Sequence, residues 1–154
     1  KRDQKRTKEA LKSLETLVRR YPNSSYASEA KNRIRVARDV LAAADMNVGR
    51  YYLNRKNYLA AINRFKSVIK NYQTTQHVEE ALARIAEAYM ALGIASEAQT
   101  AGAILGHNFP NSPWYKDTYA LLKSGGLAPR NNSGSWLSKT WKNTLNAAKK
   151  LNPI

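Results

Sequence analysis

The stretch LVRRYPNSSY, residues 17–26, decides the fold because its pattern returns twice further along the chain. It returns as VIKNYQTTQH at 68–77 and as LGHNFPNSPW at 105–114. Each copy begins with an apolar residue, has an aromatic residue four positions later, and continues with hydroxyl and amide side chains. Such internal repetition is typical of proteins built from similar units stacked on one another.

The bulk composition limits what the chain can be. Its 154 residues are enough to bury a core, and the absence of cysteine removes disulfides, thiolate metal sites and thiol catalysis. No run approaches the roughly 18 apolar residues that a membrane span needs. The first ten residues, KRDQKRTKEA, are charged rather than apolar and do not form a secretion signal. We therefore expect a mature piece or a fragment.

Positive charge is concentrated at the two ends of the chain. Residues 1–56 hold 15 Lys and Arg against 6 acids, which gives +9. Residues 57–124 hold 6 against 5, and residues 125–154 hold 5 and no acid. Basic surfaces attract nucleic acid, anionic lipid or acidic proteins, although a plain solvated surface is the alternative.

Apolar residues recur at helical spacing without any alternation of period two, so we predict an all-α fold. One short and one long helix begin the chain, at about 5–20 and 25–54, with Asn23, Ser24 and Ser25 as cap candidates between them. The predicted apolar stripe of the first is Ala10, Leu14, Leu17 and Val18. That of the second is Ala27, Ala30, Ile34, Ala37, Leu41, Ala44, Val48 and Tyr51. A coiled-coil strand is the competing interpretation of the long stripe.

The remaining helices are shorter. One follows the turn at 55–57, and the others are predicted at about 75–92, 96–108 and 113–123. The first of these buries Tyr58, Ala61, Ile62, Phe65, Val68 and Ile69, and the next turns Val78, Leu82, Ile85, Ala86 and Tyr89 inward before Gly93 ends it.

The helix pairs resemble the tetratricopeptide repeat, in which small residues let paired helices cross closely and a proline ends the second helix. The matching positions are Gly49, Tyr52, Ala61 and Phe65 in one copy, Ala86, Tyr89, Gly93, Ala98 and Pro110 in the next, and Ala10, Leu14 and Pro22 in a partial first copy. The resemblance implies an α-solenoid of stacked helical hairpins.

A more specific resemblance covers residues 5–123. The YPNSSY turn, the pattern formed by Tyr51, Tyr52, Arg55, Tyr58, Ala60, Asn63 and Arg64, and the spacing between them resemble the C-terminal half of the BamD (YfiO/ComL) family. These are lipoproteins of the outer-membrane β-barrel assembly machinery. The resemblance implies a non-catalytic adaptor at the periplasmic face of the outer membrane. Its C-terminal repeats would dock on the POTRA domains of BamA and on other BAM lipoproteins.

In that family the N-terminal repeats are linked to unfolded outer-membrane proteins and a lipidated cysteine anchors the chain. We expect this chain to lack both the anchor and those repeats. We divide it into repeats at 1–124, a linker at 125–135 and a basic amphipathic tail at 136–154. Ser135 is the predicted cap of the tail helix, and Trp136, Leu137, Trp141 and Leu145 are its predicted docking residues. The tail covers an exposed end of the repeats, binds a partner or lies on a membrane.

Two candidate binding surfaces follow from the repeat geometry. The inner face, from the first helix of each pair, should expose Met46, Arg50, Leu53 and Asn54, then Ala83, Glu87 and Met90. On the second-helix side, Asn63, Arg64 and Lys66 should face outward, and the guanidinium of Arg64 suits a carboxylate on a partner. The predicted partner-binding residues are Asn63, Arg64, Lys66, Arg50, Asn54 and Arg55.

Catalytic patterns were sought and not found in the sequence. His77 and His107 have no metal-ligand partner at helical spacing, and no phosphate loop or nucleophile elbow is present. Glu79 and Glu80 are adjacent and suit the first turn of a helix. We expect no enzyme, no cofactor and no metal. The alternative function is a basic helical-repeat scaffold for nucleic acid or another assembly, because Lys31, Arg33, Arg35 and Arg38 cluster within two turns.

Overall fold

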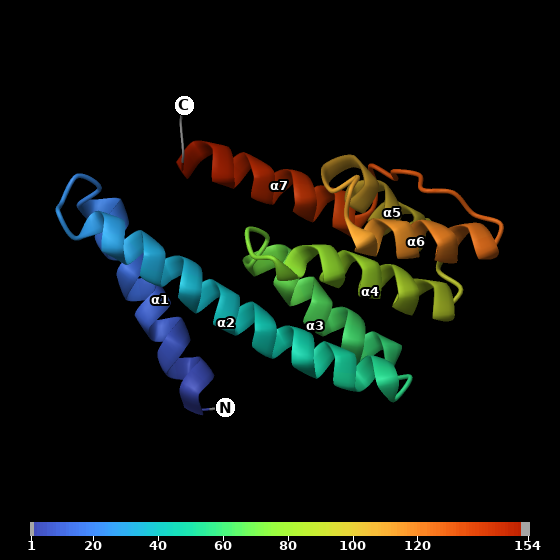
Figure 1. The fold of residues 1–154 in the computed structure, drawn as a ribbon, viewed down its shortest axis with the longest axis horizontal. Helices are drawn as coiled ribbons and strands as arrows, with labels where there is room; N and C mark the ends of the chain where they lie inside the picture. The colour runs from blue at the N-terminus through green and yellow to red at the C-terminus, as the bar shows by residue number, and fades with distance from the viewer. Residues whose placement is uncertain (1, 152–154) are drawn as a thin grey trace.

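The structure, a computed structural model, describes residues 2–151, with side chains from 4 to 144 and at 146. Its described part is all-α and forms tetratricopeptide-type helical repeats, as predicted (Figure 1). The helices are α1 (Arg2–Arg20), α2 (Ala27–Asn54), α3 (Tyr58–Asn71), α4 (His77–Ala91), α5 (Ala95–Asn108), α6 (Pro113–Ser124) and α7 (Trp136–Leu151).

Consecutive helices from α1 to α6 pack against one another. α2 lies against α1 and α3, α4 against α3 and α5, and α6 against α4 and α5. The first helices of the pairs, α2 and α4, also touch each other, as do α4 and α6. Figure 1 shows α2 running as one long rod from the turn after α1 to the far end of α3. The architecture is therefore a short stack of hairpins, α2–α3 and α4–α5, flanked by α1 and α6.

The recurring aromatic residue marks the same turn three times. The carbonyl of Tyr21 accepts a hydrogen bond from the backbone N–H of Ser24, at 3.2 Å. Tyr72 with Thr75, at 3.0 Å, and Phe109 with Ser112, also at 3.0 Å, repeat the bond. In the second copy the hydroxyl of Thr75 also donates to the carbonyl of Tyr72, whereas in the third the hydroxyl of Ser112 accepts from the N–H of Trp114. The turn between one pair and the next is thus a conserved piece of backbone geometry along this chain.

A second turn recurs at the C-terminal ends of α2, α4 and α6. Lys56 adopts φ 59°, and Gly93 and Gly126 both adopt φ 72°. The three positions are 37 and 33 residues apart, and each N–H donates to a carbonyl three residues earlier. Glycine suits a positive φ because it has no Cβ to collide with the backbone. The same turn therefore ends α2, α4 and α6.

The core lies where the hairpins cross. Phe65 of α3 is fully buried, and its ring occupies the space that a Cβ on Gly49 of α2 would need, only 2.5 Å away. Ala61 and Ala98, at matching positions of α3 and α5, are also fully buried. Small residues thus let the paired helices approach closely, as the repeat pattern predicts.

The predicted stripes of the first two helices are partly wrong. Ala10 is exposed and Leu17 is 36% exposed, while Leu11 packs against the core in their place. In α2 the buried residues after Leu41 are Ala42, Met46, Gly49 and Leu53, and Tyr51 is 51% exposed. The stripe rotates because α2 contacts α1, α3 and α4 in turn: Arg38 pairs with Glu15 of α1, and further along the helix Asp45 pairs with Arg64 of α3 and Arg50 with Glu80 of α4. The predicted cap at 23–25 is also absent, since Tyr26 is the N-cap and makes no side-chain capping bond.

Candidate protein-binding surfaces

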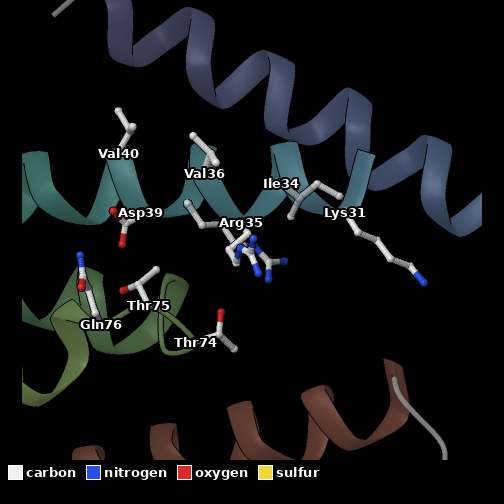
Figure 2. Close-up of a pocket in the computed structure, with 10 residues that line it drawn as sticks. Lys31, Ile34, Arg35, Val36, Asp39, Val40, Thr74, Thr75 and Gln76 are labelled. Atoms are coloured by element: carbon white, nitrogen blue, oxygen red, sulfur yellow. The ribbon is translucent and has the colours of Figure 1, made fainter. Parts of the chain in front are cut away.

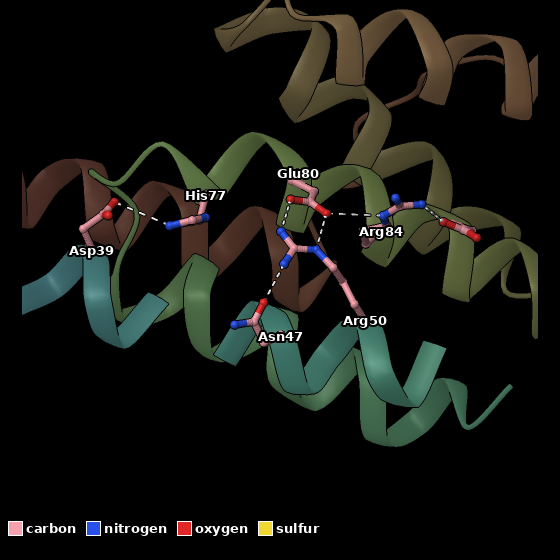
Figure 3. A network of polar contacts seen from close by, with 7 residues as sticks. Asp39, Asn47, Arg50, His77, Glu80 and Arg84 are labelled. Carbon is pink, nitrogen blue, oxygen red and sulfur yellow. Dashed lines mark hydrogen bonds and ion pairs between the residues drawn. The ribbon is translucent and has the colours of Figure 1, made fainter. Parts of the chain in front are cut away.

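A polar ladder crosses the first helices of the pairs (Figure 3). Glu80 of α4 is only 8% exposed, and its carboxylate accepts a hydrogen bond from Nε of Arg50 on α2, at 2.7 Å. Arg84, one turn further along α4, lies 3.6 Å from the same carboxylate and 2.8 Å from Glu87. A carboxylate that is mostly buried needs such partners, because an unpaired buried charge is costly. Glu80 therefore ties α2 to α4.

The electrostatics of the ladder favour the ionised carboxylate. The hydrogen bond from Arg50 lowers the pKa of Glu80 more than burial raises it. The same bond raises the pKa of Arg50. The guanidinium of Arg84 also lies over the ring of Trp114 on α6, 5.2 Å from its centroid. Three successive first helices, α2, α4 and α6, are thus linked by polar contacts.

This ladder corrects the predicted inner face. Met46 is fully buried, and Leu53 and Ala83 are each 8% exposed, so these three belong to the core. They point between helices because α2 touches α4 directly. Arg50 is engaged with Glu80 instead of being free for a partner.

The other predicted contacts on α2 lie at its C-terminal end. Asn54 and Arg55 are exposed. The guanidinium of Arg55 stacks over the ring of Tyr51, 4.7 Å from the centroid. These two residues lie beside the hairpin turn, about one helical turn beyond Arg50.

The second-helix surface has a different character. Asn63, Arg64 and Lys66 of α3 are all exposed. Arg64 is paired with Asp45 of α2 at a long distance of 3.4 Å, and its side chain remains 48% exposed. Asp45 also accepts a hydrogen bond from the hydroxyl of Ser67, at 2.7 Å. Arg64 therefore keeps one face open to solvent while a second bond holds its partner in place.

The tail helix α7 lies against α3 and α5. Leu137 is fully buried, and Trp141 is 6% exposed with its ring edge-to-face against Phe109. Trp136 donates its indole N–H to the hydroxyl of Tyr89, at 2.8 Å, and its ring lies under the ammonium of Lys66, 4.3 Å away. The side chain of Leu145, a fourth predicted docking residue, lies outside the described residues. α7 thus covers the flank of the second helices, and α6 forms the end of the stack.

The segment between α6 and α7 is tied to α5 by hydrogen bonds. The side chain of Gln99 donates to the carbonyl of Ala128, at 2.9 Å, and the N–H of Arg130 donates to the carbonyl of Gln99, at 3.2 Å. Ser135 accepts a bond from the N–H of Leu137 and donates to Glu97 on α5, at 2.6 Å. Ser135 is therefore the cap that the sequence predicts, and it also fixes the start of α7 to the repeats.

The two histidines lie apart. His77 is the first residue of α4, and its Nε2 is 3.5 Å from Asp39 of α2, whereas His107 is exposed near the end of α5. Within residues 2–151, no group of three side chains is arranged to hold a metal ion. No helix in the same range is both long and apolar enough to cross a membrane.

Sequence reasoning missed the most connected side chains. Glu80 lies in the first turn of α4, as predicted, but its pairing across to α2 was not predicted. Its spacing of four residues from Arg84 was a signal for a pair within one helix, but nothing in the local pattern links it to Arg50, 30 residues earlier. The contact of Trp114 with Arg84 was not predicted either, because the two residues lie on different helices and 30 positions apart.

Stacked antiparallel hairpins with glycine and alanine at their crossings define this chain as a tetratricopeptide-type helical-repeat protein. Residues 1–105 match the family described as "YfiO: Outer membrane lipoprotein". The chain belongs to this family. The matched part ends within α5, so α6, the following segment and α7 lie beyond it.

Curated relatives agree with this family. The chain is 49% identical over 128 residues to the outer membrane protein assembly factor BamD of Caulobacter vibrioides, covering 83% of this chain and 42% of that protein. It is 47% identical over 122 residues to BamD of Rickettsia prowazekii, covering 79% and 49%. BamD of Neisseria meningitidis is 42% identical over 113 residues, covering 73% and 42%. The matched region thus spans less than half of each of these relatives.

Proposed function

We propose that the chain is a non-catalytic, protein-binding adaptor in the assembly of outer-membrane β-barrel proteins. The observation that carries the proposal is the 49% and 47% identity to relatives named as outer membrane protein assembly factors. The architecture supports it, because stacked helical hairpins present extended surfaces to other proteins. The work of such an adaptor is to hold and position its partners at the periplasmic face of the outer membrane.

The α3 surface, formed by Asn63, Arg64 and Lys66, is our candidate contact for the POTRA domains of BamA. Arg64 suits this role because its guanidinium is half exposed and its bond to Asp45 is long, so a second carboxylate has room to bind. Trp136 of α7 lies against Lys66 at the edge of this surface. The tail helix therefore borders the proposed contact.

The test is the Arg64→Glu variant, which reverses the charge on α3. We expect its affinity for purified BamA POTRA domains to fall at least tenfold, equivalent to about 1.4 kcal/mol, in isothermal titration calorimetry. Helicity should not change, because Arg64 is exposed.

Arg130→Glu is the matched control. Arg130 is exposed, lies in the segment before α7, and uses only its backbone N–H in a hydrogen bond. Binding by this variant should stay within twofold of the wild type. Equal losses in both variants would show only a general charge effect, and unchanged binding in Arg64→Glu would remove the α3 surface from the contact.

A further inference from the structure

A groove of about 500 Å³ lies between the C-terminal half of α5 and the first turns of α7. On each helix the lining residues follow one another at spacings of three and four, so each wall is a single helix face. We call this site the α5–α7 groove. Its lining includes Ile104, His107 and Asn108 on α5, Ser138, Trp141 and Lys142 on α7, and Asn131 in the segment before α7.

The groove carries positive charge and no carboxylate lines it. Lys142 and His107 are exposed, and neither has a carboxylate within ion-pair distance among the described residues. Residues 118–154 contain no Asp or Glu. Glu97, the one acid of α5, accepts the bond from Ser135 at 2.6 Å. The groove therefore suits an anionic ligand.

Two side-chain amides of the groove each have one hydrogen-bonding group without a partner among the described residues. Asn108 donates its Nδ2 to the carbonyl of Ile104, at 2.7 Å, which leaves its Oδ1 free. Asn131 accepts at its Oδ1 from the hydroxyl of Ser138, at 2.6 Å, which leaves its Nδ2 free. A peptide backbone offers an N–H for the first and a C=O for the second. A phosphate group offers no N–H, so the two amides favour a peptide.

The floor of the groove is apolar. Ile104 and Trp141 both line it and are each 6% exposed, with the ring of Trp141 held edge-to-face against Phe109. In an extended peptide, successive side chains point to opposite sides. A segment that alternates acidic and apolar residues can therefore turn apolar side chains to this floor and carboxylates to the basic rim.

A second hollow, of about 660 Å³ between α2 and the turn from α3 to α4, carries two further cations (Figure 2). Lys31 and Arg35 extend there on the side of the Thr74–Gln76 turn, without a carboxylate at ion-pair distance among the described residues. Figure 2 shows Val36 and Val40 extending from the opposite side of α2. Cations and exposed aliphatic side chains are thus separated on α2, whereas the α5–α7 groove brings an ammonium group and an apolar floor together.

We infer that the α5–α7 groove binds an extended acidic segment of a protein partner. A carboxylate of the segment pairs with Lys142, and its backbone bonds to Asn108 and Asn131. An apolar side chain of the segment covers Ile104 and Trp141. A second copy of this chain is opposed by repulsion, because the formal net charge is +15. The inference does not rest on the proposed BamA contact, since no lining residue of the groove lies on α3.

The first experiment locates the binding by nuclear magnetic resonance on the ¹⁵N-labelled full chain. The probe is an eight-residue peptide that alternates Glu and Val, with both ends blocked. The indole N–H of Trp141, which has no acceptor among the described residues, is the reporter. We expect its resonance and the side-chain amide resonances of Asn108 and Asn131 to shift, with smaller changes at Trp114 and Trp136. Equal shifts of all three indoles, or none at Trp141, would overturn the inference.

The second experiment measures affinity by fluorescence anisotropy with the same peptide carrying fluorescein. Peptides with Gln for Glu, or with Ser for Val, should bind at least tenfold and fivefold more weakly. Lys142→Glu should weaken binding at least tenfold. Asn131→Asp keeps the acceptor for Ser138 but loses the free donor, so it should weaken binding at least fivefold. Circular dichroism verifies that each variant is folded.

Lys31→Glu is the matched control, because Lys31 is also exposed and lies in the second hollow. It should change binding less than twofold. Equal effects of Lys142→Glu and Lys31→Glu would overturn the inference in favour of general charge attraction. Vesicles of phosphatidylglycerol test a lipid partner, and binding to them that depends on Lys142, without binding of the peptide, would also overturn it. Either failure leaves the Arg64→Glu test of the BamA contact unaffected.

Discussion

At the scale of single residues, Lys56 stands at a turn position that glycine occupies in the two other copies. Its counterparts in the same turn are Gly93 and Gly126, and all three have a positive φ. A side chain with a Cβ is strained in this conformation by about 1 kcal/mol or more. Lys56 is exposed, so its side chain makes little packing contact that could offset the backbone strain.

We predict that Lys56→Gly stabilises the protein by about 0.5–1 kcal/mol, because the strain at φ 59° disappears while little contact is lost. The measurement is the free energy of unfolding by urea. Gly93→Ala is the reciprocal variant: it introduces a Cβ at φ 72° with nothing within 4 Å to clash. This variant should be destabilised by a similar amount. A loss of stability in Lys56→Gly would contradict the argument.

Residue-level prediction from the sequence succeeded where one local rule decides the outcome. Gly93 ends α4, Ser135 caps α7, and Phe65 fills the crossing of α2 and α3, all as predicted. It failed at Met46 and Leu53, because their burial depends on α4 lying against α2. Which residues of α2 are buried depends on its contacts with other helices, and the apolar pattern of α2 alone does not show these contacts.

At the scale of elements, α7 is held by packing and by polar bonds together. Leu137 and Trp141 are buried against the repeats, and Trp136 donates to Tyr89. Burial raises the pKa of the Tyr89 hydroxyl, while the hydrogen bond from Trp136 acts in the opposite direction. The sequence predicted an amphipathic helix over this range, and Leu137 and Trp141 of its predicted apolar stripe are buried. The sequence did not show where this helix packs, because an apolar stripe does not identify the element that it packs against.

We predict that Leu137→Ala detaches or loosens α7 and costs about 2–5 kcal/mol, the usual range for truncating a fully buried leucine. If α7 detaches before the rest of the chain unfolds, the measured loss in the free energy of unfolding cannot exceed the free energy with which α7 docks on the repeats. Tryptophan fluorescence should shift to longer wavelength, since Trp136 and Trp141 would become hydrated.

Lys139→Ala is the control for this helix. Lys139 is exposed on α7, so its replacement should change stability by no more than about 0.5 kcal/mol. If Leu137→Ala has the same melting temperature and the same tryptophan fluorescence as the wild type, the docking of α7 does not depend on Leu137.

At the scale of the whole molecule, the buried carboxylate of Glu80 links the pH of the solution to the stability of the stack. Its folded pKa lies below the unfolded value near 4.5. Its contribution to stability is therefore fully present above about pH 4.5 and is lost as the pH falls through the folded pKa.

We predict that Glu80→Gln lowers the free energy of unfolding at pH 7 by about 1.5–3 kcal/mol, because Arg50 loses a charged partner. The variant should also lose less stability than the wild type between pH 6 and pH 3. Urea denaturation across this pH range is the measurement.

Glu79→Gln is the matched control for the pH experiment. Glu79 is the adjacent residue on α4 and, unlike Glu80, is partly exposed. Its variant should follow the wild-type pH profile. Parallel profiles for wild type and Glu80→Gln would show that the ladder does not carry the acid sensitivity.

The length of α2 has one more consequence. Lys31 and Arg35, two cations for which the described residues supply no ion-pair partner, lie on this helix, and so does Asp45, the residue that pairs with Arg64. Because Arg35 and Asp45 are ten residues apart on an unbroken helix, about 15 Å of rigid rise separates the two regions. A partner assembly that contacted both regions of α2 would find them at a fixed separation. Once the partner is bound at one region, its binding at the other is intramolecular. The resulting gain in affinity is available only to partners whose two binding sites have the same separation.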